Sequence, residues 1–138
     1  MRKIQFFIAI LLFSLTGCAQ KTPDAVQSAF DKKYPQENSP EWEVDSNGNF
    51  EASFKKKGEK YRADFSPEGK WIETERSIKK KDLPEVIQDI IKNEYADEDL
   101  VEIEEVDHHS KGRFYDVEFK AKGKNMDVEF NAKGQVIN

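Results

Sequence analysis

The sequence predicts an α+β fold in which two tandem units, each a helix followed by about four strands, form one antiparallel sheet of about eight strands with both helices on one face. Three observations predict it. Two segments carry apolar residues at helical spacing, several short segments alternate apolar and polar residues, and the second set of segments repeats the first at a nearly constant offset. The chain has 138 residues, of which 36% are charged and 12% are aromatic, which suits one folded domain with a modest core.

The first 18 residues have the organisation of an export signal. Arg2 and Lys3 precede an apolar run that is too short to span a membrane. The sequence "LTGC" at 15–18 resembles the lipobox of bacterial lipoproteins, in which the chain is cut before the Cys and the thiol is lipidated. We therefore expect a signal peptide and lipobox at 1–18 and a lipid anchor on Cys18, at the periplasmic face of a bacterial membrane. The alternative is ordinary secretion, with cleavage after Ala19 and a soluble periplasmic or secreted product.

Two helices are predicted by the segments "TPDAVQSAFDKKYP" and "DLPEVIQDIIKNEYAD". In each segment the apolar residues follow the spacing i, i+3, i+4, i+8, which places them on one face of a helix. Pro23 and Pro84 stand where a helix begins, and proline is tolerated in the first turn. The second set of apolar residues lies 61 positions after the first. The two sets are Val26, Ala29, Phe30 and Tyr34, and Ile87, Ile90, Ile91 and Tyr95.

Half-buried antiparallel strands are predicted by the runs "FEASF", "YRADF", "YDVEF" and "MDVEF", because each run alternates apolar and polar residues. The second pair of runs follows the first at an offset of 65, and the turn residue Gly69 corresponds to Gly134 at the same offset. The chain ends in "FNAKGQVIN", which aligns with "FSPEGKWIE" and predicts a short last strand. We therefore expect a single domain at 22–138, made of repeat one at 22–75 and repeat two at 83–138.

The polar residues of the alternating strands are expected on the sheet face that the helices leave open. Charged groups there would steer a partner and set its register more than they would add affinity. Trp71 is a candidate aromatic anchor, since it or its neighbour Ile72 should point to the open face. The alternative for Trp71 is packing against the core or a sheet edge, and for the charged residues it is cross-strand pairing that keeps the protein soluble. The charged candidates are Glu51, Arg62, Asp64, Asp116, Glu118, Asp127 and Glu129.

No catalytic residue, metal site or cofactor is expected. The net charge of −5 argues against nucleic acid, which needs a basic face. His108 and His109 are adjacent, and on a strand they would point apart, so we interpret them as part of a surface turn rather than as metal ligands. The acid-rich stretch 97–107 lacks the spacing of an EF-hand calcium loop. We interpret it as a solvated helix exit followed by an edge strand.

The paired patterns "P..V..AF...YP" and "F.A.F...G..Y...F...G.WI" resemble the PepSY-like family, also called beta-lactamase-inhibitor-like. The resemblance covers about residues 22–138 and rests on turn glycines and core aromatic residues. It implies a tandem α+β layout with a curved sheet that can hold another protein. It does not imply inhibition of a beta-lactamase, because the inhibitor's binding face is rich in aromatic residues and the corresponding face here is charged.

These observations favour a non-enzymatic protein-binding module of the cell envelope, whose protein partner the sequence does not name. An alternative is an envelope sensor or chaperone-like protein that binds a small ligand or a cation in a pocket. A third hypothesis is a hydrolase inhibitor that inserts a loop into an active site, for which the hairpin "DHHSKGR" is the candidate.

Overall fold

The computed structural model describes residues 21–138, so the predicted signal peptide and Cys18 lie outside the described residues. The N-terminal half of the described chain contains helix α1 (Asp24–Lys33) and strands β1 (Glu41–Val44), β2 (Phe50–Lys56), β3 (Glu59–Phe65) and β4 (Trp71–Ser77). A 3-10 turn, η1 (Lys80–Asp82), leads to the C-terminal half. That half contains helix α2 (Glu85–Glu94) and strands β5 (Asp99–His108), β6 (Gly112–Ala121) and β7 (Lys124–Phe130).

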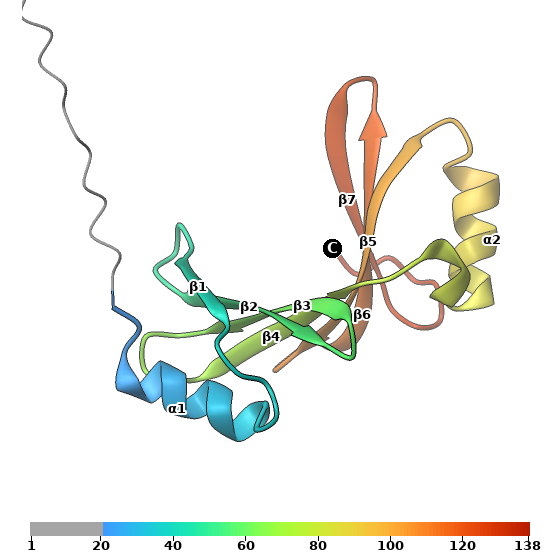
Figure 1. Ribbon diagram of the computed structural model, residues 1–138. Coiled ribbons are helices and arrows are strands. Elements are labelled where there is room, and N and C mark those ends of the chain that lie inside the picture. The colour runs from blue at the N-terminus through green and yellow to red at the C-terminus, as the bar shows by residue number, and fades with distance from the viewer. Residues whose placement is uncertain (1–20) are drawn as a thin grey trace, which may run out of the picture.

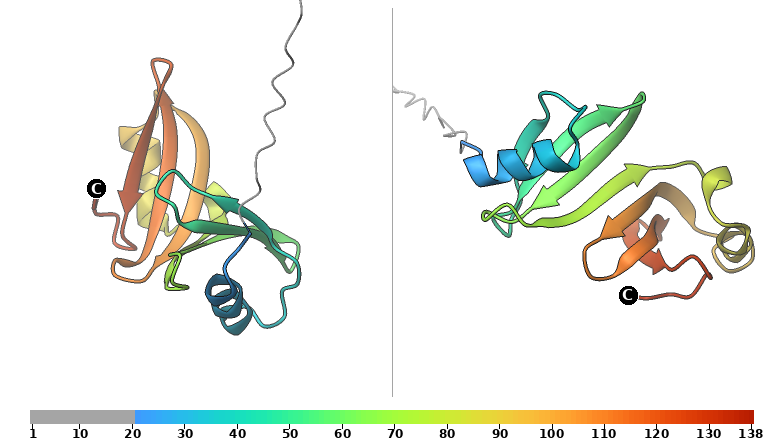
Figure 2. Two further views of the ribbon diagram at one scale, coloured as in Figure 1. Left: turned by 90° about the vertical axis from the view of Figure 1, so that its left-hand side faces the viewer. Right: turned by 90° about the horizontal axis from the view of Figure 1, so that it is seen from below.

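The strands of residues 21–138 form one antiparallel sheet of seven strands, in which spatial order follows chain order from β1 to β7. The sheet is strongly twisted, so that β2–β4 run across the view of Figure 1 while β5–β7 stand upright. Helix α1 lies below the first set of strands and α2 lies beside the second (Figures 1 and 2). The halves are joined along β4 and β5, which pair from Glu73 opposite His108 to Ser77 opposite Glu104.

Each helix covers its own hydrophobic cluster, and the register places both clusters on the same face of the sheet. Phe65 lies opposite Phe50 across β2 and β3, and Phe130 lies opposite Tyr115 across β6 and β7. The N-terminal cluster contains Val26, Phe30, Tyr34, Phe50, Ala52, Phe54, Ala63 and Phe65. The C-terminal cluster contains Leu83, Ile87, Ile91, Ile103, Tyr115, Val117, Phe119, Val128 and Phe130.

The two predicted helices are present at the predicted places, because local sequence signals and the apolar stripe agree. Asp24 and Glu85 stand in the first turns, where the helix dipole favours acids. Lys33 and Lys92 stand in the last turns, where it favours bases. The buried residues of both helices come from the predicted apolar sets.

The predicted count of about eight strands is not observed, because the expected last strand contributes a single isolated bridge, Val136 opposite Phe130. The tail instead covers the outer edge of β7. The Ile137 backbone N–H donates to the Glu129 carbonyl at 2.9 Å. The Asn138 side chain accepts from the Glu129 N–H at 3.1 Å and donates to the Asp127 carbonyl at 3.0 Å, so the amide side chain substitutes for strand backbone.

The acid-rich stretch was wrongly expected to form an edge strand. Residues 99–108 form β5, which pairs with β4 on one side and β6 on the other and therefore lies inside the sheet. Its local sequence resembles an exposed edge because it carries many acids. Those acids are tolerated because alternate positions face solvent, while Ile103 faces the core at 4% exposure.

Candidate functional site

The sheet face opposite the helices, called here the charged face, carries rows of carboxylates in direct cross-strand register. The first row contains Glu43, Glu51, Asp64 and Glu73 on β1–β4. The second contains Glu104, Asp116 and Glu129, and the third contains Glu102, Glu118 and Asp127, all on β5–β7. Directly opposed residues in a sheet lie close enough to interact, and like charges there are destabilising. These rows therefore cost stability that ordinary alternation of charge would avoid.

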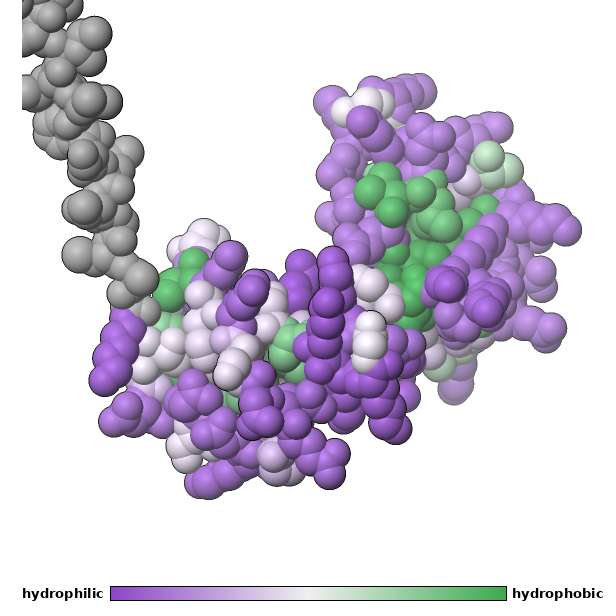
Figure 3. All heavy atoms as spheres, viewed as in Figure 1, coloured by the Kyte–Doolittle hydropathy of each residue, from purple (hydrophilic) through white to green (hydrophobic). Residues whose placement is uncertain are grey.

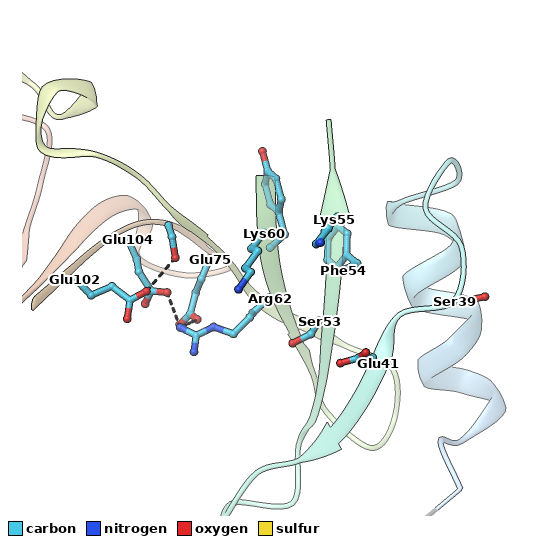
Figure 4. A pocket seen from close by; sticks show the side chains of 12 residues that line it. Ser39, Glu41, Ser53, Phe54, Lys55, Lys60, Arg62, Glu75, Glu102 and Glu104 are labelled. Carbon is cyan, nitrogen blue, oxygen red and sulfur yellow. Dashed lines mark hydrogen bonds and ion pairs between the residues drawn. The ribbon is translucent and has the colours of Figure 1, made fainter. Parts of the chain in front are cut away.

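One arginine connects the two halves across this face. The Arg62 guanidinium on β3 lies 2.6 Å from a carboxylate oxygen of Glu75 on β4 and 2.6 Å from one of Glu104 on β5. Figure 4 shows this side chain reaching from the N-terminal half toward the carboxylates of the C-terminal half. A second cation, Lys111, lies 2.8 Å from Glu129. Apart from Glu104 and Glu129, the members of the carboxylate rows have no cationic partner among residues 21–138.

Two aspartates in these rows have a buried oxygen with no hydrogen-bond partner in the described part of the chain, Oδ1 of Asp64 and Oδ1 of Asp116. Burial, reinforced by Glu51, raises the pKa of Asp64 to about 7. Burial, reinforced by Asp127, raises the pKa of Asp116 to about 6. Burial, together with the charge of Glu75, raises the pKa of Glu104 to about 7 even though Arg62 opposes the change. The charged face therefore holds carboxylates whose ionised forms are poorly solvated.

The charged face is hollowed where the two halves meet, as Figure 3 shows. A groove of about 500 Å³ crosses the face. Its lining comes from the N-terminal half and from β5, and Figure 4 shows these side chains: Ser39, Glu41, Ser53, Phe54, Lys55, Lys60, Tyr61, Arg62, Glu75, Ser77, Glu102 and Glu104. A second hollow of about 230 Å³, called here the acidic hollow, shares three of these residues. Its lining is Arg62, Glu102, Glu104, Asp116, Glu118 and Asp127.

The structure places all seven charged residues named from the sequence on this one face. Six of them belong to the carboxylate rows, and the seventh is Arg62. Trp71 is placed elsewhere. Its ring packs against the N-terminal cluster, its Nε1 donates to Thr74 Oγ1 at 2.9 Å, and Lys33 Nζ lies 3.5 Å from its ring centroid. A register shift between Asp64 and Phe65 places Trp71 opposite Phe65, which accounts for its position on the core side. A role of Trp71 in binding stays a prediction.

Several residues of the site were not named from the sequence. Glu73 and Glu75 lie on β4 and Glu102 and Glu104 on β5, and the alternating acids of "WIETE" and "VEIEE" were the available signal. Val106 and Phe114 were also missed. They lie opposite one another on the charged face, 2% and 3% exposed, and belong to neither core cluster. The charged face therefore has a small apolar floor.

Of the adjacent histidines, His108 is the last residue of β5 and His109 begins the connection to β6. His108 Nδ1 accepts hydrogen bonds from the backbone N–H groups of Ser110 at 3.1 Å and Lys111 at 3.2 Å, so it stabilises the turn. Burial, together with neighbouring His109, lowers the pKa of His108.

Within residues 21–138, no group of three or more His, Cys, Asp or Glu side chains is arranged to hold a metal ion. Over the same range no helix has the length and apolar character needed to cross a membrane.

The described residues form an α+β protein with two helices on one face of a seven-stranded antiparallel sheet. The other face is charged, hollowed and open among these residues. The chain belongs to the family described as "Putative beta-lactamase-inhibitor-like, PepSY-like", whose model matches residues 41–138. The family resemblance seen in the sequence is thereby confirmed. The match does not test whether the two halves are tandem repeats or whether the chain carries a lipid anchor.

Solved structures of similar fold come from Bacteroides species. A DUF2874 family protein from Bacteroides ovatus has a TM-score of 0.76 at 20% identity, over 86% of this chain and 86% of that one. A "BLIP-like" protein from Bacteroides fragilis has a TM-score of 0.73 at 19% identity, over 86% and 84%. A protein from Bacteroides eggerthii described as "putative periplasmic" has a TM-score of 0.75 at 20% identity, over 86% and 87%. At these identities the likeness shows the fold alone. The chain has no match among curated proteins.

Proposed function

We propose that this protein is a non-enzymatic protein-binding module of the bacterial cell envelope that uses its charged face to hold a partner. The observation that carries the proposal is the uncovered sheet face, hollowed by a groove of about 500 Å³ that spans both halves. Within residues 21–138 both helices lie on the other face (Figure 1), so this face is available for contact. Its unpaired carboxylates would gain a favourable environment from a complementary surface.

We further propose that the protein is exported and anchored by a lipid on Cys18. The support is the sequence "LTGC" and the description of one structural neighbour as "putative periplasmic". The mass of the intact protein from the producing bacterium tests this, and a Cys18→Ser variant is the control. We expect the mass of an acylated chain beginning at Cys18, and loss of membrane association in the variant. An unmodified Cys18, or a chain that begins at Gln20, would exclude the anchor.

We also infer that the two halves are copies of one unit. Support comes from the equal spacing of the two helical stripes and from the turns at Gly69 and Gly134. Both glycines have φ of 79°, and both lie against the helix of their own half. The sequence offset between the halves changes from 61 to 65, and the extra residues fall in the longer β5–β6 hairpin.

Photo-crosslinking in the producing bacterium tests the proposed face. A photoreactive amino acid is placed at Ser53 or Lys60 on the charged face, and at Asp89 or Lys92 on α2 as matched controls. We expect a protein adduct of one defined mass from the charged-face positions and no such adduct from α2. Adducts that arise equally from both surfaces, or from α2 alone, would show that the charged face is not the binding surface.

The alternative function is an envelope sensor or chaperone-like protein that takes a small ligand or a cation. The observation that favours it is the acidic hollow, whose lining is almost entirely carboxylate. It predicts that Ca²⁺ or a polyamine raises the melting temperature of the purified protein while the crosslinking experiment yields no protein adduct. The inhibitor hypothesis predicts instead that crosslinks concentrate at the β5–β6 hairpin and that replacing His108 and His109 with Ala abolishes them.

A further inference from the structure

We propose that the occupant of the groove is an extended segment of the protein partner, and that an Arg or Lys side chain of this segment enters the acidic hollow. The inference rests on the proposed function and names the chemistry that the partner must present. It is carried by the dimensions of the groove, by the distribution of charge along it, and by the way in which Arg62 already occupies one part of it.

The dimensions fit a short stretch of polypeptide. The groove is lined by residues of five neighbouring strands, from Glu41 on β1 to Glu104 on β5. Strands in a sheet are about 4.8 Å apart, so the groove is about 19 Å long, and an extended chain covers that distance with about six residues. A volume of about 500 Å³ is larger than a metal ion fills, and the aliphatic stems of Lys55 and Lys60 among the lining residues would contact the apolar parts of a peptide.

Charge is distributed unequally along the groove. Lys55 and Lys60 line its N-terminal part, while Glu102 and Glu104 line the part that continues into the acidic hollow. Five carboxylates surround the acidic hollow, and Arg62 is the cation in its lining. A basic side chain fits the acidic end by charge complementarity, whereas an acidic one would add to the like-charge repulsion already present.

Arg62 shows how a guanidinium is held on this face. Its single group contacts Glu75 and Glu104, which lie on adjacent strands, at 2.6 Å each. The third row places Glu102, Glu118 and Asp127 on adjacent strands in the same way, and none of the three forms an ion pair among residues 21–138. In the neighbouring second row, Asp116 has a buried oxygen with no hydrogen-bond partner over the same residues. A second guanidinium or ammonium group in the acidic hollow would contact carboxylates on neighbouring strands in the same way.

The test uses the full chain in mild detergent and two peptide probes, one of alternating Arg and Ser and a matched one with Glu in place of Arg. Binding is measured by fluorescence anisotropy at low and at physiological ionic strength. We expect saturable binding of the basic probe that weakens with salt and no binding of the acidic probe. Asp116→Asn combined with Glu118→Gln and Asp127→Asn should weaken binding by about tenfold or more. Arg62→Gln should strengthen it, because Glu75 and Glu104 lose their cation.

A matched control removes the same number of negative charges from exposed positions outside the face, with Asp89→Asn, Glu94→Gln and Asp97→Asn. This variant should bind the basic probe within about twofold of the unaltered protein, since exposed charges at a distance are largely screened. Equal weakening by both triple variants would show attraction to net charge alone and would overturn the proposal. The acidic-hollow variant relieves repulsion, so its melting temperature should not fall, which separates lost binding from lost folding.

Two further outcomes distinguish this inference from the proposed function. Absence of basic-probe binding, with crosslinks still confined to the charged face, would overturn the inference and leave the protein-binding function standing. Spermine or Ca²⁺ binding that the acidic-hollow variant abolishes, without any peptide binding, would overturn the inference in favour of the small-ligand alternative.

Discussion

The N-terminal and C-terminal halves each pack one helix against antiparallel strands but fill their cores with different side chains. In the N-terminal half the Phe30 ring contacts the rings of Tyr34, Trp42, Phe54 and Phe65, with centroid distances of 5.2–6.3 Å. In the C-terminal half the corresponding helix position is Ile91, and aliphatic residues make up more of the cluster. The comparison shows that helix-on-sheet packing requires an apolar stripe of suitable volume rather than a particular residue.

The halves differ more on the charged face than in their cores. Arg62 on β3 corresponds, at the offset of 65, to Asp127 on β7. The N-terminal row that contains Arg62 therefore includes a cation, whereas the matching row of β5–β7 contains carboxylates alone. Solvent-facing positions do not contribute to either core, so they can change charge without altering the fold. This difference in charge makes one end of the groove more basic and the other more acidic.

The largest expected effects come from emptying each core at corresponding positions. Phe30→Ala should lower the free energy of unfolding by about 4 kcal/mol and Ile91→Ala by about 3 kcal/mol, because each leaves a cavity. Equilibrium denaturation measures both values. Hydrogen exchange should show lost protection mainly in the altered half, since the two clusters are separate. Equal loss in both halves would show that the β4–β5 pairing couples them into one unit.

A smaller difference is expected between Gly69 and Gly134, two turn glycines that share a φ of 79°. A Cβ at Gly69 would lie 2.5 Å from the backbone oxygen of Ala25, whereas one at Gly134 would meet side-chain atoms of Ile90 at 2.7 Å and Val86 at 3.0 Å. Gly134→Ala should cost about 1–2 kcal/mol, chiefly from its positive φ. Gly69→Ala should cost at least about 1 kcal/mol more, because backbone cannot move aside as a side chain can. Thermal unfolding of the two variants provides the comparison, and equal losses would contradict it.

The smallest effects concern the carboxylate rows. Burial, reinforced by Glu51, raises the pKa of Asp64 from the ordinary 3.8 to about 7, so the folded state binds its proton more tightly. Stability should therefore fall as the pH rises from about 4 to about 7. Asp64→Asn and Asp116→Asn should each stabilise the protein by about 0.5–1 kcal/mol at pH 8, the range for one like-charged cross-strand pair.

These gains should vanish near pH 4, where the wild-type carboxyl groups are protonated as well. Melting temperatures measured across this range test the sign, with Asp89→Asn as a matched control on the exposed surface of α2. A melting temperature that rises steadily from pH 5 to pH 8 would contradict the assignment of repulsion to these rows.

The sequence predicts the helices and most of the strands because their signals are local. The stripe at Ile87, Ile90 and Ile91 and the alternation of "YDVEF" each depend on a few neighbouring residues. The position of β5 inside the sheet depends on the pairing of residues far apart in the chain, and acid content alone suggested an edge. The position of Trp71 depends on a register shift that no local pattern reveals.

The charged face was predictable from alternation, but the groove was not. The hollow arises from the twist of the sheet between β4 and β5, which brings Arg62 to Glu104 across 42 positions of sequence. The like-charged rows likewise follow from register. Glu104, Asp116 and Glu129 are unremarkable acids along the chain and become neighbours when β5, β6 and β7 align.

The tail on β7 has a consequence for self-association. A sheet grows into a filament when copies add at both edges, because each added chain must offer a new edge to the next. Here Ile137 and Asn138 hydrogen-bond to the outer backbone groups of Glu129 and Asp127, whereas β1 at the opposite edge is four residues long. Pairing through β1 would favour two chains, since the C-terminal part of each copy's other edge already hydrogen-bonds to the tail. The tail thus limits edge-to-edge polymerisation of the sheet.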